Sequence, residues 1–153
     1  MPVRNAAHAP TALRILLVDD NAHGLSARKN VLEELGHRIV TATSGADALE
    51  QFSHQKFDLV VTDYKMPRMD GIELIARLRK SVPELPVILV SGYAETLGMS
   101  ENGTGADAII QKSNNEVSHL VRAVNRLVHR KPPVKKPATS EGKTAPRAKR
   151  KAT

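Results

Sequence analysis

The chain has 153 residues, of which 23 are Lys or Arg, 16 are Asp or Glu and none is Cys. The absence of cysteine excludes disulfide bonds, thiolate metal sites and cysteine nucleophiles. No apolar run approaches the roughly 18–20 residues that a membrane-spanning helix needs, and the first residues lack the layout of a signal peptide. We therefore expect a soluble intracellular protein.

The net charge of +7 is concentrated at one end of the chain. Residues 131–153 hold eight basic side chains and one acidic one, so the preceding 130 residues are balanced. This end is also rich in Pro, Lys and Ala, a composition that cannot offset its ordering entropy by burial. We predict a disordered segment at 1–12, a folded domain at 13–130 and a disordered basic tail at 131–153.

Short apolar runs alternate with segments of helical period in the folded part. The runs are uninterrupted and rich in β-branched residues, as in strands that are buried on both faces of a parallel sheet. They occupy residues 15–18, 39–40, 59–61, 87–90 and 109–110.

Helix signals lie between and after these runs. Leu25, Leu32 and Leu35 share one helical face, and Gly36 follows as a plausible stop. Capping-box spacing predicts the starts of three more helices, at Ser44 with Asp47, Asp70 with Glu73 and Ser113 with Glu116. The glycine-rich segment 92–105 predicts one short or mobile helix, because each interior glycine costs a helix about 1 kcal/mol relative to alanine.

Five strands and five helices in strict alternation predict an α/β fold. Right-handed crossovers then give a doubly wound, five-stranded parallel sheet of the (βα)5, flavodoxin-like type. The six histidines show no metal-ligand spacing, and we expect them on the surface.

Polar side chains follow the predicted strands at their carboxyl ends, the edge where open α/β sheets bind ligands. Asp19 and Asp20 follow the first run, Asp63 the third, Ser91 the fourth and Lys112 the fifth. Three neighbouring carboxylates repel one another unless a cation intervenes, and Mg²⁺ is the hard cation that combines carboxylate, water and phosphate ligands. With a hydroxyl and an ammonium nearby, the set predicts a site that stabilises a phosphoryl group in transfer to an aspartate.

Four segments resemble, in order, the response-regulator receiver domain of two-component systems. Its first strand and acidic pair resemble residues 15–21 (ILLVDDN), and its phosphoacceptor loop, D-x-x-M-P-x-M-D-G, resembles residues 63–71 (DYKMPRMDG). Its fourth strand resembles residues 86–92 (PVILVSG), and its fifth resembles 105–107 together with Lys112. The resemblance covers about residues 13–128 and implies the strand order 2-1-3-4-5 of CheY-like proteins.

The resemblance implies that Asp63 accepts a phosphoryl group from the phosphohistidine of a sensor histidine kinase or histidine phosphotransfer protein. It also implies a Mg²⁺ site, with Asp20, Asp63 and the backbone carbonyl of Lys65 as direct ligands and Asp19 acting through water. Such a protein assists its own phosphorylation and dephosphorylation, so we expect a phosphoacceptor rather than a turnover enzyme.

In the same family pattern, Ser91 binds a phosphoryl oxygen and pulls its loop inward, and Lys112 pairs with the phosphoryl charge. Lys65 and Tyr93, each two residues past a site position, border the expected pocket and could tune the lifetime of the acyl phosphate. The resemblance further implies a bacterial cytoplasm and a downstream protein target. That target would bind the face formed by the fourth helix, the fifth strand and the fifth helix.

The sequence departs from the family pattern in three respects. Ile109 occupies a position that is often aromatic in receivers, so the rotating-ring switch is absent in that form. Ser113 follows Lys112 where the family usually has Pro, often with a cis bond. No output domain follows the receiver, which predicts a single-domain response regulator.

Other functions remain possible at this point. The basic tail at 131–153 could make the chain a binding module for nucleic acid or another polyanion, with the receiver as a regulatory or degenerate domain. An enzyme of the haloacid-dehalogenase type also uses an aspartate nucleophile and Mg²⁺, but it usually has a second Asp where this chain has Lys65. A dinucleotide-binding fold is disfavoured because no G-x-G-x-x-G follows the first strand.

Overall fold

The computed structural model describes residues 12–129. The predicted tail at 131–153 and the predicted segment at 1–12, apart from Ala12, lie outside the described residues and stay predictions. The strands are β1 (Arg14–Val18), β2 (Arg38–Ala42), β3 (Leu59–Asp63), β4 (Val87–Ser91) and β5 (Ala108–Gln111). The helices are α2 (Ala22–Glu34), α3 (Gly45–His54), α4 (Gly71–Ser81), α5 (Glu101–Thr104) and α6 (Glu116–His129).

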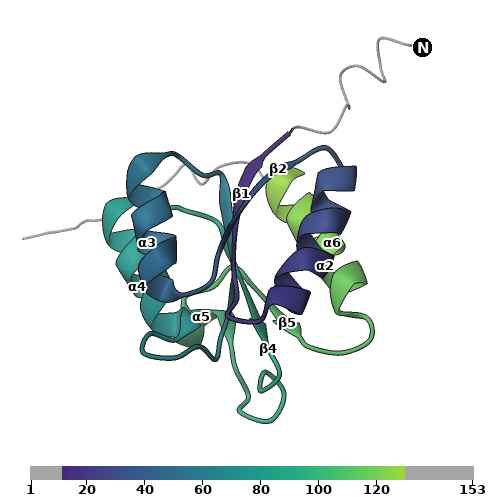
Figure 1. Cartoon of the computed structure of the whole chain (residues 1–153). Helices are drawn as coiled ribbons and strands as arrows, with labels where there is room; N and C mark the ends of the chain where they lie inside the picture. Colours follow the sequence, from purple (N-terminus) through teal and green to yellow (C-terminus); the bar gives the residue numbers. More distant parts are fainter. Residues whose placement is uncertain (1–11, 130–153) are drawn as a thin grey trace, which may run out of the picture.

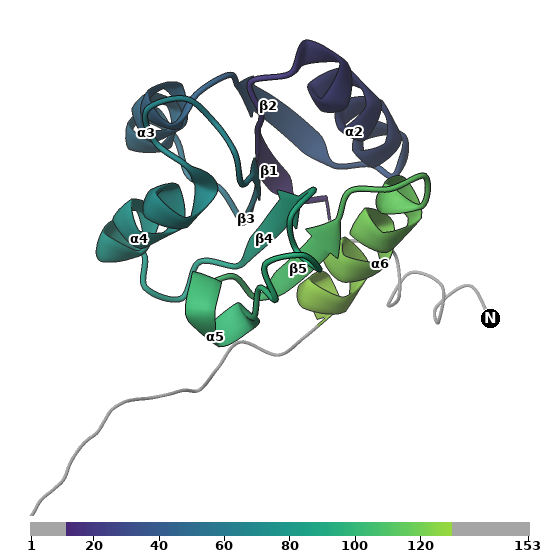
Figure 2. The same cartoon turned by 90° about the horizontal axis from the view of Figure 1, so that it is seen from below.

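The five strands form one parallel sheet in the order β2-β1-β3-β4-β5, which confirms the predicted fold class and strand order. Helices α2 and α6 cover one face of the sheet, and α3, α4 and α5 lie on the other (Figures 1 and 2). All five carboxyl ends therefore point to the same edge, because every strand runs in the same direction.

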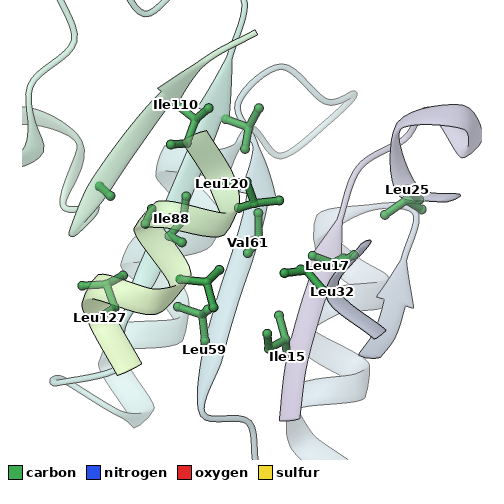
Figure 3. Close-up of a cluster of buried hydrophobic side chains, with 14 residues drawn as sticks. Ile15, Leu17, Leu25, Leu32, Leu59, Val61, Ile88, Ile110, Leu120 and Leu127 are labelled. Carbon is green, nitrogen blue, oxygen red and sulfur yellow. The ribbon is translucent and has the colours of Figure 1, made fainter. Parts of the chain in front are cut away.

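Alternation along the central strands divides the core into two layers. Ile15 and Leu17 of β1 pack with Leu25 and Leu120 from α2 and α6 (Figure 3), whereas Leu16 belongs to the cluster beneath α3 and α4. The central strands β3 and β4 are buried along their whole length. This double burial is why their sequences read as continuous apolar runs.

Two of the predicted helix starts are confirmed by side-chain hydrogen bonds. The Ser44 side chain accepts from the Asp47 N–H, and the Asp70 side chain accepts from the Glu73 N–H. The glycine-rich segment contains a single four-residue helix, α5, as its composition predicted. Gly36 follows α2 with φ of 99°, a conformation that favours glycine and ends the helix.

Two predictions about helix ends are wrong. Ser113 does not cap the last helix: its hydroxyl accepts from the Asn115 N–H and its carbonyl from the Glu116 N–H, so a turn precedes α6. Leu35 does not share the buried face of Leu25 and Leu32. It follows the last residue of α2, where the chain leaves the helix axis, and its side chain is 40% exposed.

His37 contradicts the prediction of surface histidines, because it is buried and its Nδ1 accepts the Leu13 N–H at 3.1 Å. Burial lowers the pKa of His37, since the charged ring is poorly solvated there. The unfolded chain therefore takes up a proton at higher pH than the folded one. The contribution of neutral His37 to the free energy of unfolding should be fully present above the ordinary histidine pKa, about 6.5. It should decrease as the pH falls through that value.

This pH dependence is measured by urea denaturation of the wild-type chain and of His37→Gln between pH 7.5 and 5. The wild type should lose stability over this range more steeply than His37→Gln, which has no ring to protonate. Equal slopes for the two proteins would contradict this role of His37.

Candidate functional site

The acidic residues that follow β1 and end β3 meet at the carboxyl edge of the sheet. Asp19, Asp20 and Asp63 each offer one carboxylate oxygen, and these three oxygens lie within 4.8 Å of one another. Asp19 and Asp63 are buried, whereas Asp20 is exposed. The parallel register between β1 and β3 produces this arrangement, since Val18 lies opposite Thr62 and the two acidic ends follow directly.

Lys112 reaches the same cluster from the end of β5. Its Nζ lies 2.8 Å from Oδ1 of Asp63, in a salt bridge whose lysine side chain is 36% exposed and whose aspartate is 5% exposed. Burial raises the pKa of Asp63; the hydrogen bond from Lys112 opposes this rise, and the charge of Asp19 adds to it. The Asp63 carboxyl group therefore lies in a poorly solvated position, with the Lys112 ammonium in direct contact.

Asp19 is held by two hydrogen-bond donors, one on each carboxylate oxygen. Its Oδ1 accepts from the Asn21 N–H at 2.9 Å, and its Oδ2 accepts from Nη1 of Arg28 at 2.7 Å. Asn21 in turn caps α2, because its side chain accepts from the Gly24 N–H. Asn21 thus connects the first turn of α2 to Asp19 through two hydrogen bonds.

Arg28 is a site residue that the sequence analysis missed. It is buried, and its Nε also donates to Oε2 of Glu116 at 2.7 Å, so one guanidinium joins Asp19 to the first turn of α6. Burial by itself would lower the pKa of Arg28, but the hydrogen bonds to Glu116 and Asp19 outweigh it and the pKa is raised. The sequence did contain a signal for this residue, because Arg28 lies between Leu25 and Leu32 on the apolar face of its helix.

Ser91 ends β4 next to β3 and is 1% exposed. Its hydroxyl oxygen accepts a hydrogen bond from the Tyr93 N–H at 2.8 Å. In this conformation the Ser91 side chain therefore stabilises the loop that follows β4. Lys65 and Tyr93 lie together, with the Lys65 Nζ 5.4 Å from the centre of the Tyr93 ring. Both border a hollow that is also lined by Tyr64, Met66, Asp70 and Leu97.

The loop that carries Asp63 returns closely upon itself at Gly71. The Gly71 N–H donates to the Tyr64 carbonyl at 2.7 Å, which brings the start of α4 against the end of β3. A Cβ atom at residue 71 would lie 2.3 Å from the Asp63 carbonyl oxygen and 2.8 Å from Cδ1 of Leu89. Only a residue without a side chain fits this contact.

The donor chemistry of the cluster fits a hard divalent cation. Asp20 is exposed, one oxygen of Asp63 faces it within the cluster, and carboxylate oxygens are the ligands that Mg²⁺ prefers. Asp19 already accepts one hydrogen bond on each oxygen, which suits a contribution through water or through charge.

Comparison with known proteins agrees with this fold. A family model of the response regulator receiver domain matches residues 15–125. The chain therefore belongs to the receiver-domain family of two-component response regulators, and the predicted resemblance is confirmed.

Two curated relatives show the range of proteins that carry this domain. The chain is 34% identical over 129 residues to a gliding motility regulatory protein of Myxococcus xanthus, covering 81% of this chain and 17% of that protein. It is 29% identical over 115 residues to the response regulator receiver protein CpdR of Brucella abortus, covering 75% and 96%. The chain thus spans less than a fifth of the first relative and nearly all of the second.

Two solved structures share the fold. One is the response regulator TrrA of Thermotoga maritima in complex with Mg²⁺ and BeF, with 33% identity and a TM-score of 0.67. That comparison covers 74% of this chain and 97% of TrrA. The other is a CheY-like receiver domain protein of Methanospirillum hungatei, with 33% identity, a TM-score of 0.67 and coverage of 76% and 94%.

In the described part of the chain, no helix has the length and apolar character needed to cross a bilayer.

Proposed function

We propose that this receiver accepts a phosphoryl group on Asp63 from the phosphohistidine of a kinase or phosphotransfer protein. The observation that supports it most strongly is the placement of the buried Asp63 carboxylate, 2.8 Å from the Lys112 ammonium and within the three-aspartate cluster. The chain then acts as a phosphoacceptor that assists its own phosphorylation and dephosphorylation, and not as a turnover enzyme.

In the transfer step, one carboxylate oxygen of Asp63 forms a bond to phosphorus while the P–N bond to the donor imidazole breaks. The electron pair of the P–N bond stays on the imidazole nitrogen, and the product on Asp63 is an acyl phosphate. Lys112 offsets the charge that the phosphoryl group brings into the site. Ser91 can donate its hydroxyl proton to a phosphoryl oxygen, because the bond from Tyr93 uses the hydroxyl only as an acceptor.

Asp20, Asp63 and the backbone carbonyl of Lys65 would hold Mg²⁺, with Asp19 contributing through water. When bound, such a cation supplies electrostatic stabilisation of phosphoryl oxygens. TrrA, whose structure contains Mg²⁺ and BeF, is a relative of the same fold and supports this assignment. Lys65 and Tyr93, which contact each other and line one hollow, would regulate access of water to the acyl phosphate.

The test is incubation of the full chain with acetyl phosphate or a phosphohistidine donor, followed by intact-mass spectrometry. A gain of one phosphoryl group is expected with Mg²⁺ and not after chelation with EDTA. Failure to gain mass from either donor in the presence of Mg²⁺ would contradict the proposal.

Lys112→Met is expected to slow phosphoryl transfer to Asp63 by about 10²–10³-fold, the usual effect of removing one hydrogen-bond donor that stabilises the transition state. The substitution removes the ammonium and keeps most of the aliphatic stem. The rate is followed by the same mass assay over time. Lys80→Met, which removes an exposed ammonium in the last turn of α4, is the matched control and should retain transfer within about tenfold.

A downstream protein would bind the face formed by α5, β5 and α6, as we infer from the family. Residues of all three elements line one hollow there, including Glu101, Ile109, His119 and Arg122. The predictions that the receiver stands alone and that 131–153 contacts a polyanion stay predictions, the second because the tail lies outside the described residues.

A further inference from the structure

Asp19, Arg28 and Glu116 form a network of two ion pairs that takes no part in the phosphoryl-transfer step described above. One guanidinium is shared between two carboxylates at 2.7 Å each, and these come from the end of β1 and the first turn of α6. The residues of the inner pair are 1% and 3% exposed, so water screens their interaction little. Arg28 therefore places a permanent positive charge at the back of the acidic cluster.

The local backbone is shaped around this pair. A Cβ atom at residue 24 would lie 2.8 Å from Oδ2 of Asp19 and 3.6 Å from Nη1 and Nη2 of Arg28. Gly24 thus leaves the space that the pair occupies, although glycine is a poor helix former. A side chain larger than hydrogen at this position would displace the carboxylate or the guanidinium.

A divalent cation in the acidic cluster and the guanidinium of Arg28 compete for the same negative charge on Asp19. Arg28 weakens the attraction of the cluster for the metal, because it neutralises one of the three carboxylates. Glu116 has the opposite effect through Arg28, because it offsets part of the guanidinium charge and draws it away from Asp19. The balance between these two carboxylates then sets how much charge remains for the metal.

We propose that Arg28 is a positioning residue that sets the affinity of the cluster for Mg²⁺, and that Glu116 of α6 tunes this affinity through Arg28. The inference rests on the proposed metal site. Because linked equilibria are reciprocal, binding of Mg²⁺ to the cluster must then strengthen the ion pair between Arg28 and Glu116. The metal site and the start of α6 are coupled in this way.

The test measures the dissociation constant of Mg²⁺ alone for the full chain by isothermal titration calorimetry. Arg28→Met, which keeps the bulk and removes the charge, should bind Mg²⁺ at least threefold more tightly, in the direction required by Coulomb's law. Glu116→Gln should bind Mg²⁺ at least threefold more weakly. A merely structural role would loosen the site in both variants and weaken binding in both.

The double variant distinguishes action through Arg28 from a direct field of Glu116. If Glu116 acts through Arg28, Glu116→Gln should have little effect in the Arg28→Met background, so the two changes should not be additive. Lys29→Met and Glu33→Gln alter an exposed ion pair on the same helix, with side chains 41% and 43% exposed, and should leave binding unchanged. Circular dichroism verifies that each variant is folded.

Glu116 is 17% exposed, so variants at this position should fold even where Arg28→Met does not. Glu116→Asp, which keeps the charge but shortens the side chain, should then bind Mg²⁺ more tightly than Glu116→Gln, which keeps the size but removes the charge. The reverse order would indicate a merely structural role and overturn the inference. Shifts of the same sign in Arg28→Met and Glu116→Gln, additive shifts or an unchanged Glu116→Gln would overturn the inference and leave the metal site intact. Absence of Mg²⁺ binding to the wild-type chain would instead overturn the proposed metal site, and the inference with it.

Discussion

Asp63→Asn is expected to abolish phosphoryl incorporation under conditions that add one phosphoryl group to the wild-type chain. The amide has the shape of the carboxylate but lacks the nucleophilic oxygen anion, so an acyl phosphate cannot form. Asp63 is buried at the end of the third strand, and Lys112 contacts it directly. Intact-mass spectrometry after reaction with acetyl phosphate and Mg²⁺ measures the result.

Asp70→Asn is the matched control for this substitution. Asp70 lies in the same loop and caps α4 through the Glu73 N–H, and asparagine caps helices about as well as aspartate. This variant should fold and gain one phosphoryl group. Phosphorylation of Asp63→Asn at an undiminished level would assign the acceptor to another residue.

Gly71→Ala is expected to lower the free energy of unfolding by about 3 kcal/mol, the upper end of the usual cost of overpacking. The new methyl group would contact the Asp63 carbonyl and Leu89, and neither can move without disturbing β3 or β4. The contact with Asp63 is through its backbone, so the substitution should displace the Asp63 carboxyl group as well. Urea denaturation monitored by circular dichroism gives the change in stability.

The control is Gly92→Ala, because a Cβ atom at residue 92 meets no atom within 4 Å and its φ is not in the left-handed region. Its stability should stay within about 0.5 kcal/mol of the wild type, as for most surface substitutions. Equal stabilities of the two alanine variants would show that the loop around Gly71 adjusts without cost.

The strands and the convergence of the acidic residues could be predicted because both depend on short stretches of sequence. A strand buried on both faces requires a continuous apolar run, and in a parallel sheet every residue that follows such a run is delivered to the same edge. Asp19 and Asp63 are therefore neighbours in space, although one follows β1 and the other ends β3. The caps at Ser44 and Asp70 are equally local, since each bonds to a residue three positions away.

The features that could not be predicted depend on distant partners or on competing local bonds. Arg28 and Glu116 are 88 residues apart, and no periodicity relates them. Ser113 has the spacing of a helix cap, but its hydroxyl bonds two residues ahead and forms a turn instead. His37 looked like a surface residue because its partner, the Leu13 N–H, belongs to the chain just before β1.

The two ion pairs at the β5–α6 connection restrict how this stretch of chain can vary. Lys112 at its start bonds to Asp63, and Glu116 four residues later bonds to Arg28. An insertion or deletion that shifted the first turn of α6 relative to β5 would move Glu116 away from Arg28 while Lys112 kept its contact with Asp63. We therefore expect tolerance to side-chain changes at the exposed Asn114 and less tolerance to a change in residue number.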